Sequence, residues 1–212
     1  MNGQTNITVL FFVLIVAACQ TPDQPLLLQE NSTTRLVEVA STRSPEELAL
    51  LNKIANRTLL QEVIDQAPKE QVETTSFGCS AQSGGVVSFI HKAQKLKGVR
   101  LSLSQEYLGR STRWYYQDNQ EVVLIAHEQS EWQGNKEAIR QTVFYVDEGE
   151  LIQVLHRAIK AVPRRLEAVL EQTPFQKVPP LSQEALWLQL QIEEQMILPH
   201  QESANYTAYF CS

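Results

Sequence analysis

The sequence contains none of the short motifs that mark nucleotide-binding and hydrolytic sites. It has no glycine-rich phosphate loop, no dinucleotide fingerprint, and no serine in the Gly-x-Ser-x-Gly pattern of a nucleophile elbow. The stretch HEQSE at residues 127–131 begins like a zinc-binding helix, but it lacks the second histidine four residues after the first. We interpret it as a solvated loop at the end of a strand, and we predict no catalytic residue, no metal site and no cofactor.

Positive charge is also scarce. The 212-residue chain has 18 lysines and arginines against 24 aspartates and glutamates, which gives a net charge of −6. A protein that binds nucleic acid needs a basic face to neutralise phosphates, so this balance argues against a nucleic-acid partner. One local basic group, interpreted as the solvated face of a helix, consists of Arg157, Lys160, Arg164 and Arg165.

The apolar run near the start of the chain is too short to cross a membrane. Residues 7–18 are apolar apart from Thr8, and as a helix they would span only about 18 Å of a hydrocarbon core that is about 30 Å thick. Their length fits the hydrophobic region of a signal peptide, and the small residues Ala17 and Ala18 end the run. We predict a signal peptide over residues 1–18, although the stretch before the run contains no lysine or arginine.

Cys19 directly follows this run. The string Val16-Ala17-Ala18-Cys19 resembles the bacterial lipobox, and the resemblance implies that the Cys19 thiol is lipidated and becomes the anchor of the mature chain. Gln20 follows instead of Asp, which by the same resemblance points to the outer membrane, on its periplasmic or its surface side. The alternative is a plain secretory signal peptide on a secreted protein. Sequons that could be glycosylated in such a protein begin at Asn31, Asn56 and Asn205.

Cysteine is rare, with three residues in the chain. If Cys19 carries lipid, Cys79 and Cys211 remain, and an even remainder in an oxidising compartment favours a disulfide between them. Such a bridge would tie down a C-terminal segment that otherwise frays. The alternative is two unrelated thiols, one buried and one exposed.

The rest of the sequence divides into a tether, a helix, a sheet region and a helical region. Residues 19–43 are rich in Pro, Thr, Ser and Gln without clean periodicity, which predicts a flexible tether. A capping box at residues 44–47 begins a predicted amphipathic helix over residues 44–67. Residues 77–158 show the two-residue alternation of strands, and helical periodicity returns over residues 159–212.

Two stretches of the sheet region match each other at a step of 29 residues. WYYQDNQEVVLI and VFYVDEGELIQV each run from aromatic residues through an Asp-containing turn into an aliphatic segment, which predicts two β-hairpins. The alignment places Tyr116 and Tyr145 at equivalent positions in one sheet. Because a lone hairpin is marginally stable, we predict an antiparallel meander of five or six strands. Flanking helices can bury themselves only against this sheet, so the predicted fold class is α+β.

This hairpin pattern, together with GCSAQ at residues 78–82, resembles the repeated aromatic-turn-aliphatic hairpins of small uncharacterised bacterial lipoproteins. The resemblance covers residues 78–157. It implies this architecture and a location in the bacterial cell envelope, and it carries over no functional residues.

The aromatic residues at the strand ends are a candidate binding face. They could form a platform that stacks against a ligand, or they could pack across strands in the core. The residues are Trp114, Tyr115, Tyr116, Phe144 and Tyr145.

Three function classes remain open. The first is a non-enzymatic envelope lipoprotein, held at the membrane by its lipid, that binds a protein or small-ligand partner through the sheet face. The second is an inhibitor or immunity-type protein, and the third is an enzyme whose site is assembled from residues distant in sequence. The absence of any catalytic motif favours the first class.

Overall fold

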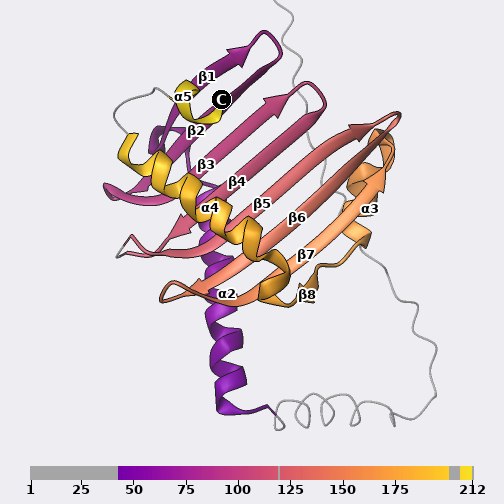
Figure 1. The fold of residues 1–212 in the computed structure, drawn as a ribbon. Helices are drawn as coiled ribbons and strands as arrows, with labels where there is room; N and C mark the ends of the chain where they lie inside the picture. The colour runs from indigo at the N-terminus through magenta and orange to yellow at the C-terminus, as the bar shows by residue number, and fades with distance from the viewer. Residues whose placement is uncertain (1–42, 119, 201–205, 212) are drawn as a thin grey trace, which may run out of the picture. The chain divides into compact units, whose positions relative to one another are not determined.

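A computed structural model describes residues 43–118, 120–200 and 206–211. Eight strands form one antiparallel sheet in which each strand pairs with the next one along the chain (Figure 1). The strands are β1 (Val72–Ser80), β2 (Ser83–Lys92), β3 (Lys95–Gln105), β4 (Leu108–Tyr116), β5 (Val122–Gln133), β6 (Lys136–Asp147), β7 (Glu150–Ala161) and β8 (Gln176–Val178). The predicted antiparallel meander is therefore confirmed.

The number of strands differs from the prediction of five or six. β1 begins at Val72, before residue 77, where the sequence predicts that the sheet region begins. It is an edge strand with one largely exposed face, and such a strand tolerates polar residues. β8 is too short to show any periodicity. β7 runs on to Ala161, through residues that were expected to begin the helical region at residue 159.

Helices pack on both faces of the sheet (Figure 1). α2 (Pro45–Asp65) lies on one face, and α4 (Glu184–Ile197) crosses the other. α3 (Leu166–Gln172) packs against β7, and α5 (Thr207–Phe210) packs against β1. In the part of the chain that the structure describes, no helix is both long and apolar enough to span a bilayer.

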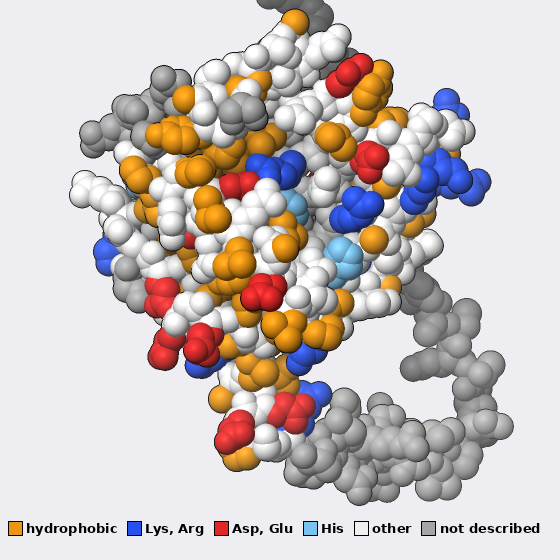
Figure 2. All heavy atoms as spheres, viewed as in Figure 1, with side chains coloured by type: hydrophobic (Ala, Val, Ile, Leu, Met, Phe, Trp, Pro, Cys, Tyr) orange, Lys and Arg blue, Asp and Glu red, His pale blue; other side chains and the backbone are white. Residues whose placement is uncertain are grey.

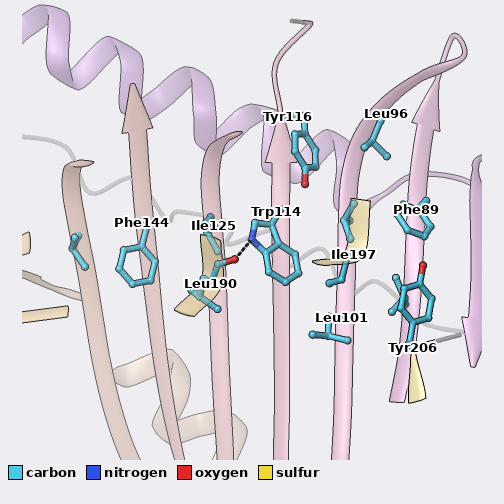
Figure 3. Packing of buried hydrophobic residues seen from close by; sticks show 13 residues of the cluster. Phe89, Leu96, Leu101, Trp114, Tyr116, Ile125, Phe144, Leu190, Ile197 and Tyr206 are labelled. Atoms are coloured by element: carbon cyan, nitrogen blue, oxygen red, sulfur yellow. Dashed lines mark hydrogen bonds between the residues drawn. The ribbon is translucent and has the colours of Figure 1, made fainter. Parts of the chain in front are cut away.

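The larger core lies between the sheet and α4 (Figure 3). Trp114 of β4 stands at its centre and is fully buried. Its indole Nε1 donates a hydrogen bond to the carbonyl oxygen of Leu190 in α4, at 3.3 Å. Leu190 and Ile197 lie two helical turns apart and are both fully buried, so one face of α4 packs against the sheet.

A smaller core lies between the sheet and the C-terminal half of α2. Its buried members are Ile64, Ile90, Tyr115, Leu124 and Tyr145. The helix comes close to the sheet at Gly98 of β3, where an added Cβ would stand 2.8 Å from Cγ2 of Ile64. Only a residue without a side chain leaves room for α2 at this position.

The five aromatic residues that the sequence offers as a binding face are buried, so that candidate is wrong. Trp114, Tyr116 and Phe144 are at most 1% exposed beneath α4, and Tyr115 and Tyr145 are at most 5% exposed on the α2 face. Burying the large apolar area of these rings against the helices stabilises the fold. These five residues instead pack within the core, as the alternative interpretation predicts.

The hairpins β4–β5 and β6–β7 repeat one arrangement, with an alignment that differs from the predicted one. Tyr115 and Tyr145 both belong to the α2-face core, whereas Tyr116 belongs to the α4-face core. The predicted equivalence of Tyr116 with Tyr145 is therefore wrong by one residue. The first hairpin encloses residues 117–121 within its last strand pair, and the second encloses the shorter segment 147–150 at the corresponding pair.

A disulfide joins Cys79 of β1 to Cys211, just after α5. Next to it, Phe210 stacks on Phe77 with ring centroids 5.8 Å apart, and Tyr206 contacts the same ring at 5.9 Å. The C-terminal segment is thus fixed to the edge strand by both covalent and aromatic contacts.

The N-terminal predictions fall on residues that the structure does not describe. The predicted signal peptide (residues 1–18), Cys19 and the tether (residues 19–43, except its last residue) lie outside the described ranges. The sequons at Asn31 and Asn205 lie outside them as well, and Asn56 is exposed on α2.

Candidate functional site

A cavity of about 380 Å³ opens on the sheet face that carries α2. Thr58 and Gln61 of α2 form one wall, and Phe175, which follows α3, forms the opposite wall. The floor comes from Ser111, Arg113, Ala126, Glu128, Gln141, Val143, Tyr145, Leu155 and Arg157. The intervening residues His127 and Thr142 also border the cavity, although strand alternation points their side chains to the opposite face. We call this cavity the α2–α3 groove. Its volume lies in the range of small-molecule sites.

Strand register builds the floor of the groove as two rows across four strands. Paired residues of neighbouring strands point to the same side, so each row runs across β4, β5, β6 and β7. The first row is Arg113, Ala126, Val143 and Leu155, and the second row is Ser111, Glu128, Gln141 and Arg157. The first row is apolar after its arginine, and the second row is polar throughout.

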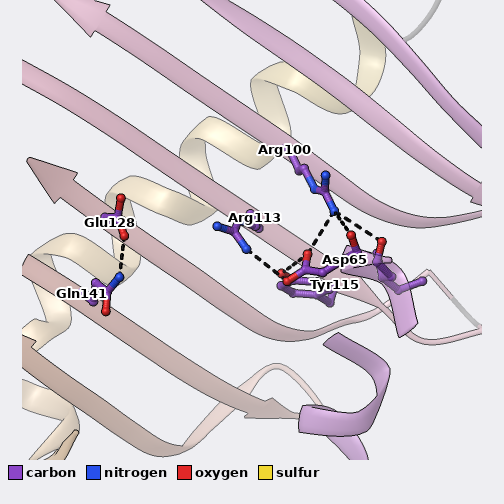
Figure 4. A network of polar contacts seen from close by, with 7 residues as sticks. Asp65, Arg100, Arg113, Tyr115, Glu128 and Gln141 are labelled. Carbon is purple, nitrogen blue, oxygen red and sulfur yellow. Dashed lines mark hydrogen bonds and ion pairs between the residues drawn. The ribbon is translucent and has the colours of Figure 1, made fainter. Parts of the chain in front are cut away.

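Asp65, the last residue of α2, fixes the β4 side of the groove (Figure 4). Its carboxylate accepts hydrogen bonds from the Tyr115 hydroxyl at 2.9 Å, from Arg100 Nη2 at 3.1 Å and from Arg113 Nη1 at 3.1 Å. Burial, and next the negative charge of Asp65, raise the pKa of Tyr115, so its hydroxyl stays protonated and donates. Arg113 is held in place by this network while 39% of its side chain stays exposed.

A second hydrogen-bond chain runs along the polar row. Arg157 Nε donates to Gln141 Oε1 at 2.6 Å, and Gln141 Nε2 donates to the carboxylate of Glu128. Figure 4 shows the Glu128–Gln141 pair, with Arg113 between it and the Asp65 network. Arg157 Nη1 also donates to two carbonyl oxygens at the C-terminal end of α3, at 2.8 and 3.0 Å. The Arg157 guanidinium is therefore anchored to β6 and to α3.

This arrangement is suited to holding a ligand. Its cations are guanidiniums, which do not lose a proton at neutral pH and cannot act as general bases. Its remaining polar groups include hydroxyls and an amide, which donate and accept hydrogen bonds. Ala126, Val143 and Leu155 offer an apolar strip for the body of a ligand. Among the described residues, no group of three His, Cys, Asp or Glu side chains could hold a metal ion.

The opposite face carries a row of alternating threonines and histidines. Thr112, His127, Thr142 and His156 pair in turn across β4, β5, β6 and β7. Thr112 Oγ1 and His127 Nδ1 lie 3.0 Å apart. Burial, and next the positive charge of Arg110, lower the pKa of His127 to about 4. The interpretation of residues 127–131 as a solvated loop is wrong, because β5 continues through them and buries His127. A strand that long was not expected from a stretch rich in Glu and Gln.

The α4 face also has charged and apolar groups near the helix (Figure 2). Arg110 Nη1 and Glu193 Oε1 form an ion pair at 2.6 Å, and the Glu193 side chain is only 10% exposed. Leu188, Ile192 and Met196 form an exposed apolar stripe along α4 at four-residue spacing. The charges of Arg110 and Glu193 therefore neutralise each other.

Sequence reasoning found little of the groove. Of the five aromatic candidates, only Tyr145 borders it, and its hydroxyl lies 3.3 Å from Thr58 Oγ1. Arg157, interpreted as part of a solvated helix face, is instead a residue of β7 that points into the groove. Arg113, Gln141 and Phe175 carried no motif. Only the correct pairing register of the strands would have predicted that the strand residues among them lie side by side.

Comparison of the chain with models of known protein families, with curated proteins and with solved structures gave no match. The function is therefore argued from the described residues and from the sequence.

Proposed function

We propose that this protein is a non-enzymatic, lipid-anchored protein of the bacterial cell envelope that binds a small ligand in the α2–α3 groove. The groove is the observation that carries the proposal: an open cavity of about 380 Å³ with an apolar strip, a polar row and two anchored guanidiniums. Ligand sites have this composition, a mostly apolar lining with a few fixed polar groups that set orientation.

Two features support the envelope location. The lipobox-like string before Cys19 predicts acylation, and one thiol that bears a diacylglyceryl group is anchored by more than one acyl chain, as stable attachment requires. The Cys79–Cys211 disulfide fits a protein that folds in an oxidising compartment.

The contacts that hold the charged side chains of the groove indicate that the binding site is preorganised. Every charged group on the groove floor is held by a neighbour from a different element: Arg113 by Asp65 of α2, Glu128 by Gln141 of β6, and Arg157 by β6 and the end of α3. Holding side chains in place before binding lowers the entropy that the ligand must offset.

Native mass spectrometry tests the binding half. The full chain is incubated with a small-molecule extract of bacterial envelopes, and a bound mass is expected on the parent protein. Ala126→Trp places an indole on the groove floor and should abolish that mass. Ala158→Trp is the control, because Ala158 is exposed on the α4 face of β7. A bound mass that survives Ala126→Trp, or no bound mass on the parent, contradicts binding in the groove.

Fractionation and intact-mass analysis test the anchoring half. Cys19→Ser should leave the chain unprocessed or release it from the membrane fraction, whereas Cys79→Ser should leave the anchor intact and lower only stability. The plain secretory alternative is favoured if the Cys19→Ser chain still fractionates with membranes and shows the same mass difference from its precursor as the parent does.

A further inference from the structure

The charge partners of the arginines on the α2 side of the sheet set Arg157 apart. Arg57, Arg100 and Arg113 each form an ion pair with a carboxylate. Arg157 has no carboxylate of a described residue within ion-pair distance. Its hydrogen-bond acceptors are the Gln141 amide oxygen and two main-chain carbonyl oxygens, and all of them are neutral.

Gln141 keeps the nearest carboxylate of the polar row away from Arg157. In that row Gln141 lies between Glu128 and Arg157. Its amide oxygen accepts a hydrogen bond from the arginine, and its amide nitrogen donates one to the carboxylate. Glu128 therefore orients Gln141 and does not neutralise Arg157. On its other side the Arg157 guanidinium stacks on the Phe175 ring, with its central carbon 4.3 Å from the ring centroid. A cation–π contact stabilises the charge without cancelling it.

The surroundings of Arg157 define the rest of a ligand. Leu155 lies two residues before it on the same face of β7, and Val143 and Ala126 continue from Leu155 across β6 and β5. This apolar strip spans two strand spacings, or about 10 Å. An extended octyl chain has a similar length.

We infer that the ligand of the α2–α3 groove is a small organic acid, whose carboxylate binds Arg157 and whose aliphatic body lies along Leu155, Val143 and Ala126. This inference rests on the proposed function and names the chemical class of its ligand. A guanidinium held in one orientation, with only neutral acceptors, binds a carboxylate through charge-assisted hydrogen bonds. The apolar strip buries the chain of the acid.

Three probes with one tail and different head groups test the inference. Octanoate, octylammonium and octanol are titrated by calorimetry into the full chain carrying Cys19→Ser, which removes the acylation site. Octanoate should bind about 10- to 100-fold more tightly than octanol, the effect of hydrogen bonds between charged groups. Octylammonium should bind more weakly than octanoate because Arg157 repels it.

Matched variants show whether Arg157 makes the distinction. Arg157→Gln should remove the preference for octanoate and leave octanol binding unchanged, and Arg157→Lys should restore part of the preference because it keeps a positive charge. Arg164→Gln removes an equal charge at an exposed position outside the groove and should change nothing. Melting temperatures identify any variant that fails to fold. The comparison of Arg157→Lys with Arg157→Gln then decides whether the positive charge at this position causes the preference for octanoate.

The outcomes separate this inference from the function on which it rests. Octanol binding as tight as octanoate, tighter binding of octylammonium, or a preference that survives Arg157→Gln each overturns the organic acid as the ligand class. If none of the three probes binds while the parent still carries a mass that Ala126→Trp abolishes, the acid class is wrong and groove binding stands. If that mass is also missing, both proposals fail.

Discussion

Thr112 and His127 face each other across β4 and β5, and Thr142 and His156 do the same across β6 and β7. In both pairs the threonine Oγ1 lies 3.0 Å from the histidine Nδ1. The two hairpins thus repeat one another in side-chain contacts as well as in backbone pairing. The copies differ in burial, since His127 is 6% exposed while His156 is only half-buried.

Acid should destabilise the protein through His127. Burial and Arg110 lower the pKa of His127 from its usual 6.5 to about 4, so the unfolded chain binds this proton more readily than the folded one. The stabilisation is complete above pH 6.5 and declines as the pH falls to 4, where about 3 kcal/mol is lost. His127→Gln should flatten this part of the stability profile in urea unfolding measured from pH 4 to 7. His156→Gln is the matched control and should keep the parent's slope; equal slopes for parent and His127→Gln contradict the prediction.

Asp65→Asn should loosen the attachment of α2. The substitution keeps the shape of the side chain but removes the charge that accepts bonds from Arg100, Arg113 and Tyr115. Charged hydrogen bonds in a partly buried setting predict a loss of about 2 kcal/mol in the free energy of unfolding. Asp118→Asn, which removes a carboxylate that is 74% exposed, should leave the unfolding midpoint unchanged. Equal effects of the two substitutions would refute a special role for Asp65.

Gly98→Ala should push α2 away from the sheet. The new Cβ would meet Cγ2 of Ile64 at 2.8 Å and Cδ1 of Ile90 at 3.3 Å. Overpacking of this kind costs about 1–3 kcal/mol. Gly78→Ala is the control, because no heavy atom lies within 4 Å of a Cβ at that position. Thermal unfolding of the two variants should therefore diverge, and a Gly98→Ala protein as stable as the parent would show that the helix contact is loose.

Loss of the disulfide should lower stability strongly. Cys79 and Cys211 are 132 residues apart, and the chain-entropy model assigns about 5 kcal/mol to closing a loop of that length. The double variant Cys79→Ser with Cys211→Ser should unfold at a lower urea concentration than the parent. The parent treated with a reductant should match the double variant, and a reductant that has no effect on the parent would contradict the prediction.

The fold was largely within reach of the sequence, and its missing parts have physical reasons. Strict alternation, as in Val99, Leu101 and Leu103, predicts strands because successive side chains point to opposite faces. β1 was not predicted from the sequence because the exposed face of an edge strand is polar, as a linker is. Histidine and arginine near the end of β7 resemble a helix surface, and only pairing with β6 reveals the strand.

The candidate site was far harder to predict than the fold. Its floor depends on register, and a shift of one residue sends each side chain to the opposite face. The sequence match between the two hairpins gave the wrong register for Tyr116, because the turns differ by one residue. Arg157 and Phe175 meet only after α3 has folded back against β7, a contact between segments that share no sequence pattern.

The meander sets an order in which this chain can fold. Every strand pairs with its neighbour in sequence, so the sheet can grow one hairpin at a time, and each step closes only a short loop at a small entropic cost. The thiols of Cys79 and Cys211 are the exception, since they belong to the first strand and to the segment after the last helix. The docking of α5 on β1 brings them into bonding distance. Oxidation of this pair therefore marks the chains in which the C-terminal segment has docked on the first strand.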